Sequence, residues 1–274
     1  MLFVLRRFWR RFLREILEKL AKGKITVNEA EKALQLSFVE NVANVAKLDV
    51  GRQARRSLPE IIFAEGKTTE DLVPICTRML EKNGRVIVTR LNPAQSDALR
   101  REFGNHQMER FSHANALVIR SEGHPRPQIR GKVGVLTAGT VDLGIAEEAV
   151  MIAQEMGCTT FLEADVGVAG IHRLVEPLKA MLENDVDCLI VVAGREGALP
   201  TVVAGLVDIP LIAVPASSGY GYGGNGEAAL MAMLQACSLG LAVVNIDSGV
   251  AAGVVAAQIA KRVANARMGN QFKQ

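Results

Sequence analysis

The sequence has few of the residues that cross-link or metallate a small protein. Its 274 residues include only four cysteines and four histidines. The cysteines, at 76, 158, 188 and 237, form no CxxC pair, and the histidines, at 106, 113, 124 and 172, show no metal-ligand spacing. This argues against a disulfide framework and a structural zinc site, and it is typical of thiols that the cytosol keeps reduced.

A strong charge of one sign and long hydrophobic runs are lacking as well. A net charge of +3 is too small to indicate a nucleic-acid partner. No apolar run approaches the ~18 residues that a membrane-spanning helix needs. Hydrophobic residues nevertheless make up 49% of the chain, which is ample for a core. We therefore expect a cytoplasmic globular protein.

Residues 1–22 predict an amphipathic helix, with apolar side chains along one face and arginine and lysine along the other. The segment has neither the continuous apolar region nor the small-residue cleavage site of a secretory signal. Two interpretations stay open. The helix could lie on an anionic membrane surface, or it could pack on its own protein or on a neighbouring subunit, which is the interpretation we favour.

The first half of the chain predicts a small α/β unit of three strands. The strands are expected at 61–64, 85–89 and 116–120, and helices at 26–35, 70–82 and 93–103, with Thr68 or Thr69 as an N-cap. Ser121–Lys132 contains two prolines and no periodicity, so it predicts a domain boundary. The predicted domains are 1–127, helical with a small α/β unit, and 128–274.

The second half predicts a doubly wound parallel α/β sheet. Apolar strands are expected at 133–136, 159–162, 188–192, 211–214 and 241–245, alternating with helices that include 145–156, 171–182 and 250–266. In such sheets ligands bind beyond the carboxyl ends of the strands. The loops at these ends are rich in glycine, serine and aspartate, so they are the predicted active site.

Three loops carry the polar candidates. Gly139 and Thr140 could bind phosphate at a helix N-terminus, and Asp142 could bind ribose hydroxyls or simply favour that terminus. His172, predicted in the first turn of a helix, could be structural or an acid–base group. Glu196, between two glycines, could hold a metal, position water or act as a base, and the glycine-dense Ser217–Gly226 suits a loop that closes over ligand.

Cys237 is predicted on an apolar helix between the last two strands. Spacing alone favours a buried, inert thiol there. Cys76, Cys158 and Cys188 also lie in apolar helix or strand segments, and they are weaker candidates for catalysis.

Several longer motifs carry a resemblance to a known family. They are LDVGRQARRSLPEIIFAEGKT (48–68), TAGTVDLGIAEEA (137–149), DVGVAGIHRL (165–174), EGALPTVVAGLVDIPLIAVPASSGYG (196–221) and AMLQACSLGLAVVNID (232–247). Residues from about 15 to 265 resemble the LarB family, the pyridinium-3,5-biscarboxylate mononucleotide synthases of nickel-pincer cofactor assembly. The carboxyl domain resembles the fold of aminoimidazole ribonucleotide carboxylase/mutase.

The resemblance implies carboxylation of nicotinic acid adenine dinucleotide with CO2 and hydrolysis of its phosphoanhydride, giving AMP. It implies Cys237 as the nucleophile, Glu196 and His172 as further catalytic residues, suspected Mg²⁺, no organic cofactor, and a homo-oligomer, with an octamer one option. The substrate-binding candidates are Gly139, Thr140, Asp142, Arg173, Gly194, Gly197, Ser218, Gly219 and Asp247.

The chain departs from the family pattern around the predicted ligand. Val141 stands where the family usually has serine, Gln235–Ala236 precedes the cysteine in place of Asn–Ser, and Asp247–Gly253 differs from the usual DNGFGAG. Two alternatives therefore stay open: a carboxylase/mutase acting on another nucleotide such as aminoimidazole ribonucleotide, with His172 as acid–base, and a non-catalytic nucleotide-binding homologue.

Overall fold

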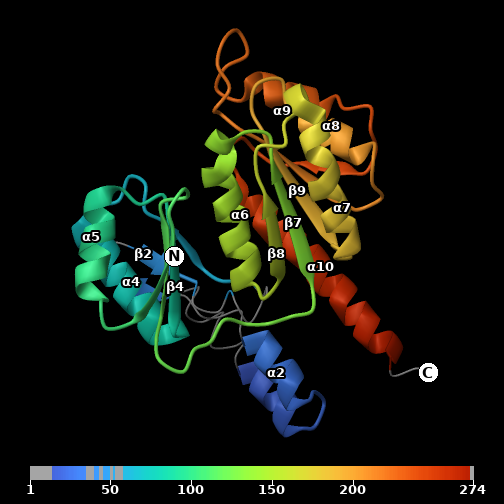
Figure 1. Ribbon diagram of the computed structural model, residues 1–274. Coiled ribbons are helices and arrows are strands. Elements are labelled where there is room, and N and C mark those ends of the chain that lie inside the picture. Colours follow the sequence, from blue (N-terminus) through green and yellow to red (C-terminus); the bar gives the residue numbers. More distant parts are fainter. Residues whose placement is uncertain (1–13, 35–39, 43–45, 50–51, 53–57, 272–274) are drawn as a thin grey trace.

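A computed structural model describes residues 14–34, 40–42, 46–49, 52 and 58–271. Figure 1 shows two α/β units side by side, with helix α6 (Leu143–Glu155) between their sheets. The mixed α/β architecture, with a parallel sheet in the carboxyl domain, is confirmed. Among the described residues no helix is long and apolar enough to cross a membrane. Most of the predicted first helix falls outside these residues, and 14–21 are helical.

The amino-terminal domain is built on a mixed four-stranded sheet in the order β3-β4-β6-β5. Its strands are β3 (Ile61–Phe63), β4 (Arg85–Thr89), β5 (Gln107–Phe111) and β6 (Ala116–Arg120), and only β3 and β4 are parallel to each other. Helices α4 (Thr69–Asn83) and α5 (Pro93–Glu102) cover one face through a core that includes Leu72, Met79 and Leu99. The preceding chain forms α2 (Val27–Leu34) and the antiparallel pair β1 (Glu40–Val42) and β2 (Ala46–Leu48).

The sequence prediction of three strands misses β5. Its sequence, QMERF, has four of five residues only partly buried or exposed, so it lacks the apolar run that reveals a core strand. The predicted N-cap is confirmed at Thr68, whose hydroxyl accepts a hydrogen bond from the Asp71 amide at 3.2 Å.

The carboxyl-terminal domain has five parallel strands in the order β11-β10-β9-β7-β8. They are β7 (Lys132–Thr137), β8 (Thr159–Glu163), β9 (Cys188–Ala193), β10 (Leu211–Pro215) and β11 (Leu241–Val243). Helices α6 and α10 (Gly249–Gln271) pack on one face. Helices α7 (Val175–Glu183), α8 (Ala198–Ala204) and α9 (Glu227–Leu234) pack on the other.

Two predicted residues lie outside the helices in which the sequence placed them. His172 belongs to a 3₁₀ segment, η3 (Val168–Leu174), which contains a kink at Gly170 (φ −140°, ψ 63°) and precedes α7. Cys237 lies beyond the end of α9 at Leu234, in a bend that turns through Gly240 (φ 94°) into β11. His172 is thus in a 3₁₀ helix and not in the first turn of an α-helix, and the placement of Cys237 on a helix was wrong.

The free face of the amino-terminal sheet packs against α6, where Ile87 and Val118 join Ala146 and Val150 in one core. Arg85, at the start of β4, contacts Glu155 at the end of α6, whereas Arg90, just after β4, contacts Glu148, about two turns earlier in the helix. Strand β4 therefore runs antiparallel to α6, as β7 does. The carboxyl ends of β3 and β4 consequently lie at the same edge as the carboxyl ends of the five parallel strands.

Candidate active site

The loops at the carboxyl ends of the parallel strands are bonded to one another. The Ser218 hydroxyl donates to Asp142 Oδ1 at 2.6 Å, and the Gly139 amide donates to Asp142 Oδ2 at 3.0 Å. The Ser217 amide donates to Asp247 Oδ1 at 2.8 Å. These bonds join the segments after β7, β10 and β11 into one surface. We call it the strand-end site: Gly139–Asp142, His172–Arg173, Gly194–Gly197, Ser217–Gly219 and Asp247.

Two glycines permit the close approach of the loops after β9 and β10. A Cβ atom on Gly194 would lie 2.5 Å from Ser218 Oγ, and one on Gly219 would lie 2.7 Å from the Arg195 backbone nitrogen. Because real Cβ atoms do not approach so closely, a side chain at either position would push the two loops apart. Arg195 also lies over the ring of Tyr220, with its Cζ 4.2 Å from the ring centroid, which ties the glycine-dense loop to the same surface.

Strained backbone also gathers at this edge. Four non-glycine residues that follow strands, one from the amino-terminal domain and three from the parallel sheet, have left-handed φ angles: Arg90 (57°), Asp165 (59°), Arg195 (54°) and Asp247 (54°). Each such conformation costs about 1 kcal/mol or more for a residue with a side chain. Strain of this kind persists where surrounding contacts hold it, and it is common at functional sites.

Asp142 is the buried acid of the strand-end site, with 2% of its surface exposed. Burial raises the pKa of this carboxyl above its ordinary value, hydrogen bonds from Ser218 and Gly139 act against that rise, and the nearby charge of Asp247 adds to it. A carboxylate so placed is ready to accept hydrogen bonds from a ligand that displaces or extends the Ser218 contact.

The other polar candidates are open to solvent. Thr140, His172, Arg173 and Glu196 are all exposed, and the Glu196 carboxylate makes no hydrogen bond or ion pair with the part of the chain that the structure describes. Arg173 pairs with Asp165, which follows β8. Val141, where the family usually has serine, is 72% exposed in the 3₁₀ turn just before α6. Thr140, His172 and Glu196 are therefore accessible to a ligand, whereas Arg173 is held by its ion pair.

Cys237 is the one candidate that the structure does not bring to the strand-end site. Helix α9 returns the chain to the amino ends of the strands, where Gly240 accepts a hydrogen bond from the amide of Leu211, the first residue of β10. The neighbouring Ser238 hydroxyl donates to Thr201 of α8 at 2.8 Å. Cys237 is therefore exposed at the opposite edge of the sheet.

The remaining thiols are buried in the cores. Burial raises the pKa of Cys76, Cys158 and Cys188 to about 12, with the charge of Asp187 contributing for the last two. Such thiols are inert at neutral pH because the thiolate is the reactive form.

Residues of the amino-terminal domain reach the strand-end site, and the sequence analysis did not select them. The Arg90 guanidinium donates to the Asp247 carbonyl, to Glu65 and to Glu148. The sequence offered one signal, the EGKT turn that contains Glu65. Nothing in local periodicity distinguishes Arg90 from other exposed arginines.

Comparisons with known proteins agree with this two-part construction. Residues 39–121 match a family described as LarB/PurE-like N-terminal domain, and residues 132–273 match one described as AIR carboxylase. The chain belongs to the LarB family. A relative from Methanocaldococcus jannaschii, an uncharacterized protein, is 42% identical over 252 residues, which cover 91% of this chain and 97% of that protein.

Two N5-carboxyaminoimidazole ribonucleotide mutases resemble part of this LarB-family chain. The mutase of Methanocaldococcus jannaschii is 35% identical over 127 residues, covering 46% of this chain and 76% of the mutase. The mutase of Thermotoga maritima is 27% identical over 133 residues, covering 47% and 74%. The resemblance supports an enzyme of the carboxylase/mutase type.

The strand-end site involves both matched segments, because Arg90, which binds the Asp247 carbonyl, belongs to the first and the parallel strands belong to the second. Within the described residues no group of three histidine, cysteine or acidic side chains is arranged to hold a metal ion. Asp142 has protein donors on both oxygens, which leaves Asp247 as the carboxylate more open to a cation.

Proposed function

We propose that this LarB-family protein carboxylates C5 of the pyridinium ring of nicotinic acid adenine dinucleotide and hydrolyses its phosphoanhydride, giving pyridinium-3,5-biscarboxylic acid mononucleotide and AMP. The observation that carries the proposal is the pairing of a polar, hydrogen-bonded strand-end site with a single exposed thiol among the four cysteines. The family membership supports carboxylation, and the thiol supports a pyridinium as the group carboxylated.

The Cys237 thiol would overcome the low reactivity of the pyridinium ring toward CO2. A pyridinium ring is electron-poor and does not attack CO2. Addition of the Cys237 thiolate to C4 moves an electron pair to the ring nitrogen and makes C5 an enamine carbon. C5 then attacks CO2, a base removes the C5 proton, and those electrons form the C4–C5 double bond as the thiolate leaves. His172 and Glu196 are exposed at the strand-end site and are the candidate bases.

The strand-end site suits the nucleotide part of this substrate. The Thr140 backbone amide opens the 3₁₀ turn that leads into α6, and a helix N-terminus attracts phosphate. Asp142 and Asp247 can accept hydrogen bonds from ribose hydroxyls. Mg²⁺ would be held chiefly by the substrate's phosphates with Asp247 as the protein carboxylate, and it would neutralise charge on the phosphoanhydride.

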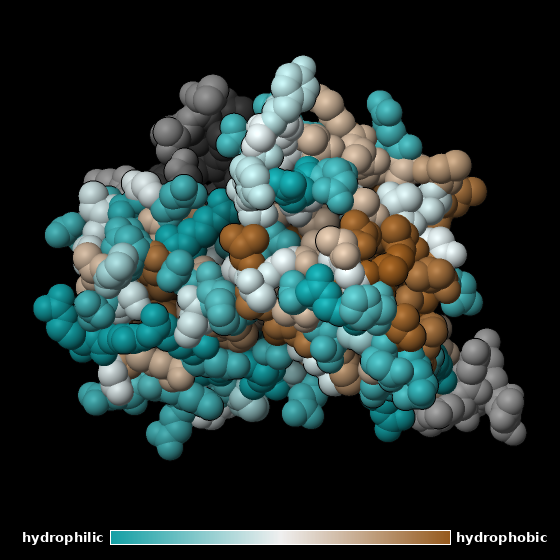
Figure 2. Space-filling view, turned by 45° about the horizontal axis from the view of Figure 1, so that its top comes forward, coloured by the Kyte–Doolittle hydropathy of each residue, from teal (hydrophilic) through white to brown (hydrophobic). Residues whose placement is uncertain are grey.

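Under this proposal, Cys237 would have to come from a second copy of the chain. A thiol at the amino ends of the strands cannot reach a ring bound at the carboxyl ends of the same sheet, because the five residues of β10 alone span ~16 Å. Figure 2 shows apolar surface gathered on the part of the carboxyl-terminal domain away from the amino-terminal domain. Exposed apolar residues of this domain include Val175, Leu206, Met231, Leu234 and Leu239. We propose that these surfaces join copies into a homo-oligomer in which Cys237 of one copy serves the site of another.

The test is incubation of the purified protein with nicotinic acid adenine dinucleotide, ¹³C-bicarbonate and Mg²⁺, with products followed by mass spectrometry. The expected products are AMP and a mononucleotide that carries one added ¹³C-carboxylate. Absence of both products from the intact oligomer would refute the proposal. Carboxylation by Cys237→Ala at the wild-type rate would refute the thiol step alone.

A second candidate is carboxylation of another nucleotide, such as aminoimidazole ribonucleotide. The placement of His172, but not Cys237, at the strand-end site favours it, together with the likeness to the two mutases. In that case N5-carboxyaminoimidazole ribonucleotide would be turned over without any dependence on Cys237. Measuring both substrates with the wild type and Cys237→Ala separates the two functions.

A further inference from the structure

Arg90 of the amino-terminal domain holds a turn of the carboxyl-terminal domain. Its Nη2 donates to the Asp247 carbonyl at 3.2 Å, and its Nε donates to Glu148 at 3.3 Å. Its Nη1 donates to Glu65 at 3.4 Å, and its Cζ lies 5.4 Å from the centre of the Phe63 ring. The left-handed φ of 57° aims this side chain across the domain boundary, and these four contacts compensate for the strain.

Glu148 binds the same turn from the other side. Its side chain is almost fully buried, it accepts the Thr89 hydroxyl at 2.7 Å, and it accepts the backbone amide of Val250 at the start of α10. Gly249 packs so closely on α6 that a Cβ there would lie 2.2 Å from the Ile145 carbonyl oxygen. Arg90, Glu148 and the backbone of α6 therefore all contact segment 247–250 and hold its position.

We propose that Arg90 is a positioning residue through which the amino-terminal domain sets the geometry of the strand-end site. The held turn presents the Asp247 carboxylate, which accepts the Ser217 amide, and the next residue, Ser218, donates to Asp142. Three successive contacts thus connect Arg90 to the buried acid. The consequence for substrate affinity rests on the function proposed above, whereas the consequence for loop order does not.

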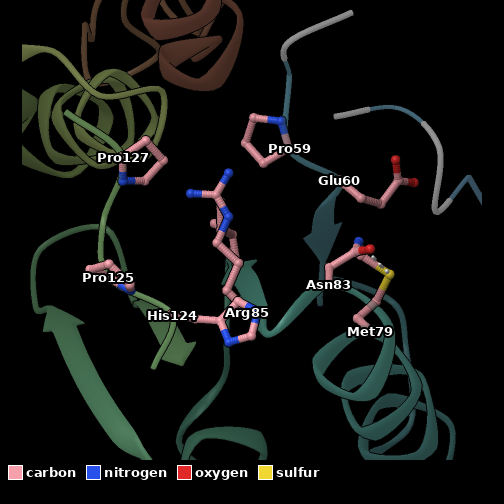
Figure 3. A pocket seen from close by; sticks show the side chains of 9 residues that line it. Pro59, Glu60, Met79, Asn83, Arg85, His124, Pro125 and Pro127 are labelled. Atoms are coloured by element: carbon pink, nitrogen blue, oxygen red, sulfur yellow. Dashed lines mark hydrogen bonds between the residues drawn. The ribbon is translucent and has the colours of Figure 1, made fainter. Parts of the chain in front are cut away.

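The chain contains a matched control at the other end of the same interface. Arg85 opens the strand that Arg90 follows, and it donates to the carbonyl and the carboxylate of Glu155 at 2.8 and 2.9 Å. Arg120 and Arg126 also bind Glu155, so the carboxylate keeps partners when Arg85 is replaced. In Figure 3 Arg85 points into a pocket between Pro125 and Pro127 on one side and Pro59 and Asn83 on the other. Arg85 is the first residue of β4, so it lies at the end of the strand opposite to Arg90.

Hydrogen exchange on the free full-length protein tests the positioning role without any substrate. In Arg90→Ala the amides of Ser217 and Val250 should exchange about tenfold faster, because the turn loses a charged hydrogen-bonding partner. Amides of β9 should be unchanged, and Arg85→Ala should leave Ser217 and Val250 unchanged. Arg90→Lys, which keeps the charge but not the three-way geometry, should resemble Arg90→Ala. Equal exchange in the Arg85 and Arg90 variants, or no change in either, would overturn the proposal.

Kinetics with nicotinic acid adenine dinucleotide measure the effect on the site. Arg90→Lys should raise KM about tenfold with a smaller change in kcat, whereas Arg85→Lys should leave both at wild-type values. A purely structural Arg90 would change thermal stability to the same extent as Arg85 and leave KM unmoved, which would contradict the positioning role. If the wild type proves inactive on this substrate while the exchange difference appears, the proposed function fails and the positioning role stands.

Discussion

The two edges of the parallel sheet differ in how their loops are held. At the carboxyl edge the loops bond to one another through Asp142, Ser218 and Asp247, and a second domain adds Arg90. At the amino edge the segment around Cys237 is exposed among apolar side chains, with Leu239 89% exposed. Under the proposed function, the first edge would hold the polar ligand. The second would present the Cys237 thiol on a surface that contacts another copy.

Under the proposed function, this difference would let one fold carry out a new reaction. The strand-end site follows from the general rule that parallel α/β sheets bind ligands beyond their carboxyl ends. An exposed thiol at the opposite edge would add covalent chemistry without disturbing that binding surface, with subunits packed edge to edge. The predictions below test the contrast, beginning with the largest expected effect.

Thiol reactivity should separate Cys237 from every other cysteine. At pH 8 a thiol with a pKa of about 12 is thiolate in only about one molecule in ten thousand. Brief treatment of the native protein with iodoacetamide should therefore alkylate Cys237 and spare Cys76, Cys158 and Cys188. Peptide mass spectrometry reads the result, and the guanidinium-unfolded protein is the control in which all four react. Early labelling of a buried cysteine would contradict the burial described above.

Replacing the thiol should abolish the proposed carboxylation. Cys237→Ala is expected to lower the rate at least about a thousandfold, as removal of a covalent nucleophile does, with little change in folding because the side chain is exposed. Cys188→Ala is the matched control, and any activity that it loses should be accounted for by the fraction of the variant that is unfolded.

Co-expression of two inactive variants tests whether the two sheet edges that form one active site come from different copies. Cys237→Ala and the double variant His172→Ala/Glu196→Gln, which lacks both candidate bases, should each be inactive alone, but mixed oligomers should recover roughly a quarter of the wild-type activity if each site takes its two edges from different copies. No recovery in verified mixed oligomers would show that the thiol and the base act within one chain.

A charge placed beside Cys237 should weaken self-association. Leu239→Glu is expected to raise the dissociation constant of the oligomer at least about tenfold, because an interface that buries the leucine would have to desolvate the new carboxylate. Sedimentation velocity measures this, and Leu182→Glu, on α7, is a control for a general charge effect. An unchanged oligomer would place the interface elsewhere.

The smallest effect is the pH dependence contributed by Asp142. Its folded pKa is raised, so between the unfolded and folded values the folded protein binds more protons, and stability falls as pH rises through that window. Asp142→Asn should remove this fall while lowering nucleotide affinity about tenfold. Thermal unfolding from pH 4 to 7 checks the slope. A steeper fall in the variant than in the wild type would contradict the raised pKa.

Local pattern was sufficient for much of the fold. Buried strands such as β9 and β10 are continuous runs of apolar residues, and the sequence placed both to within a residue at their ends. It missed β5, whose pattern is mostly polar, it began a helix at 171, where the structure has a 3₁₀ segment up to Leu174, and it extended another helix through Gln235, whose backbone angles end it. A glycine or a cap can end a helix without altering the apolar periodicity on which the prediction depends.

Local pattern also indicated some contacts at the strand-end site and missed others. Asp142, Ser218 and Asp247 were predicted to share one edge because strand-end loops do so in any parallel sheet, and hydrogen bonds link their loops in the structure. Arg90 could not be found, because its partners lie 58 and 157 positions away in the chain. No local pattern encodes such a separation.

The sequence by itself determined the family, the parallel sheet and the identity of the polar groups at its carboxyl edge, because these depend on short-range patterns and quoted motifs. Only the tertiary structure decided which edge each group occupies. It places Cys237 at the amino edge, although its sequence motif also contains Asp247 of the carboxyl edge. It also brings Arg90 to the carboxyl edge from the amino-terminal domain. The physical reason is that α9 reverses the direction of the chain and α6 aligns two separate sheets, so spatial neighbourhood is set by packing.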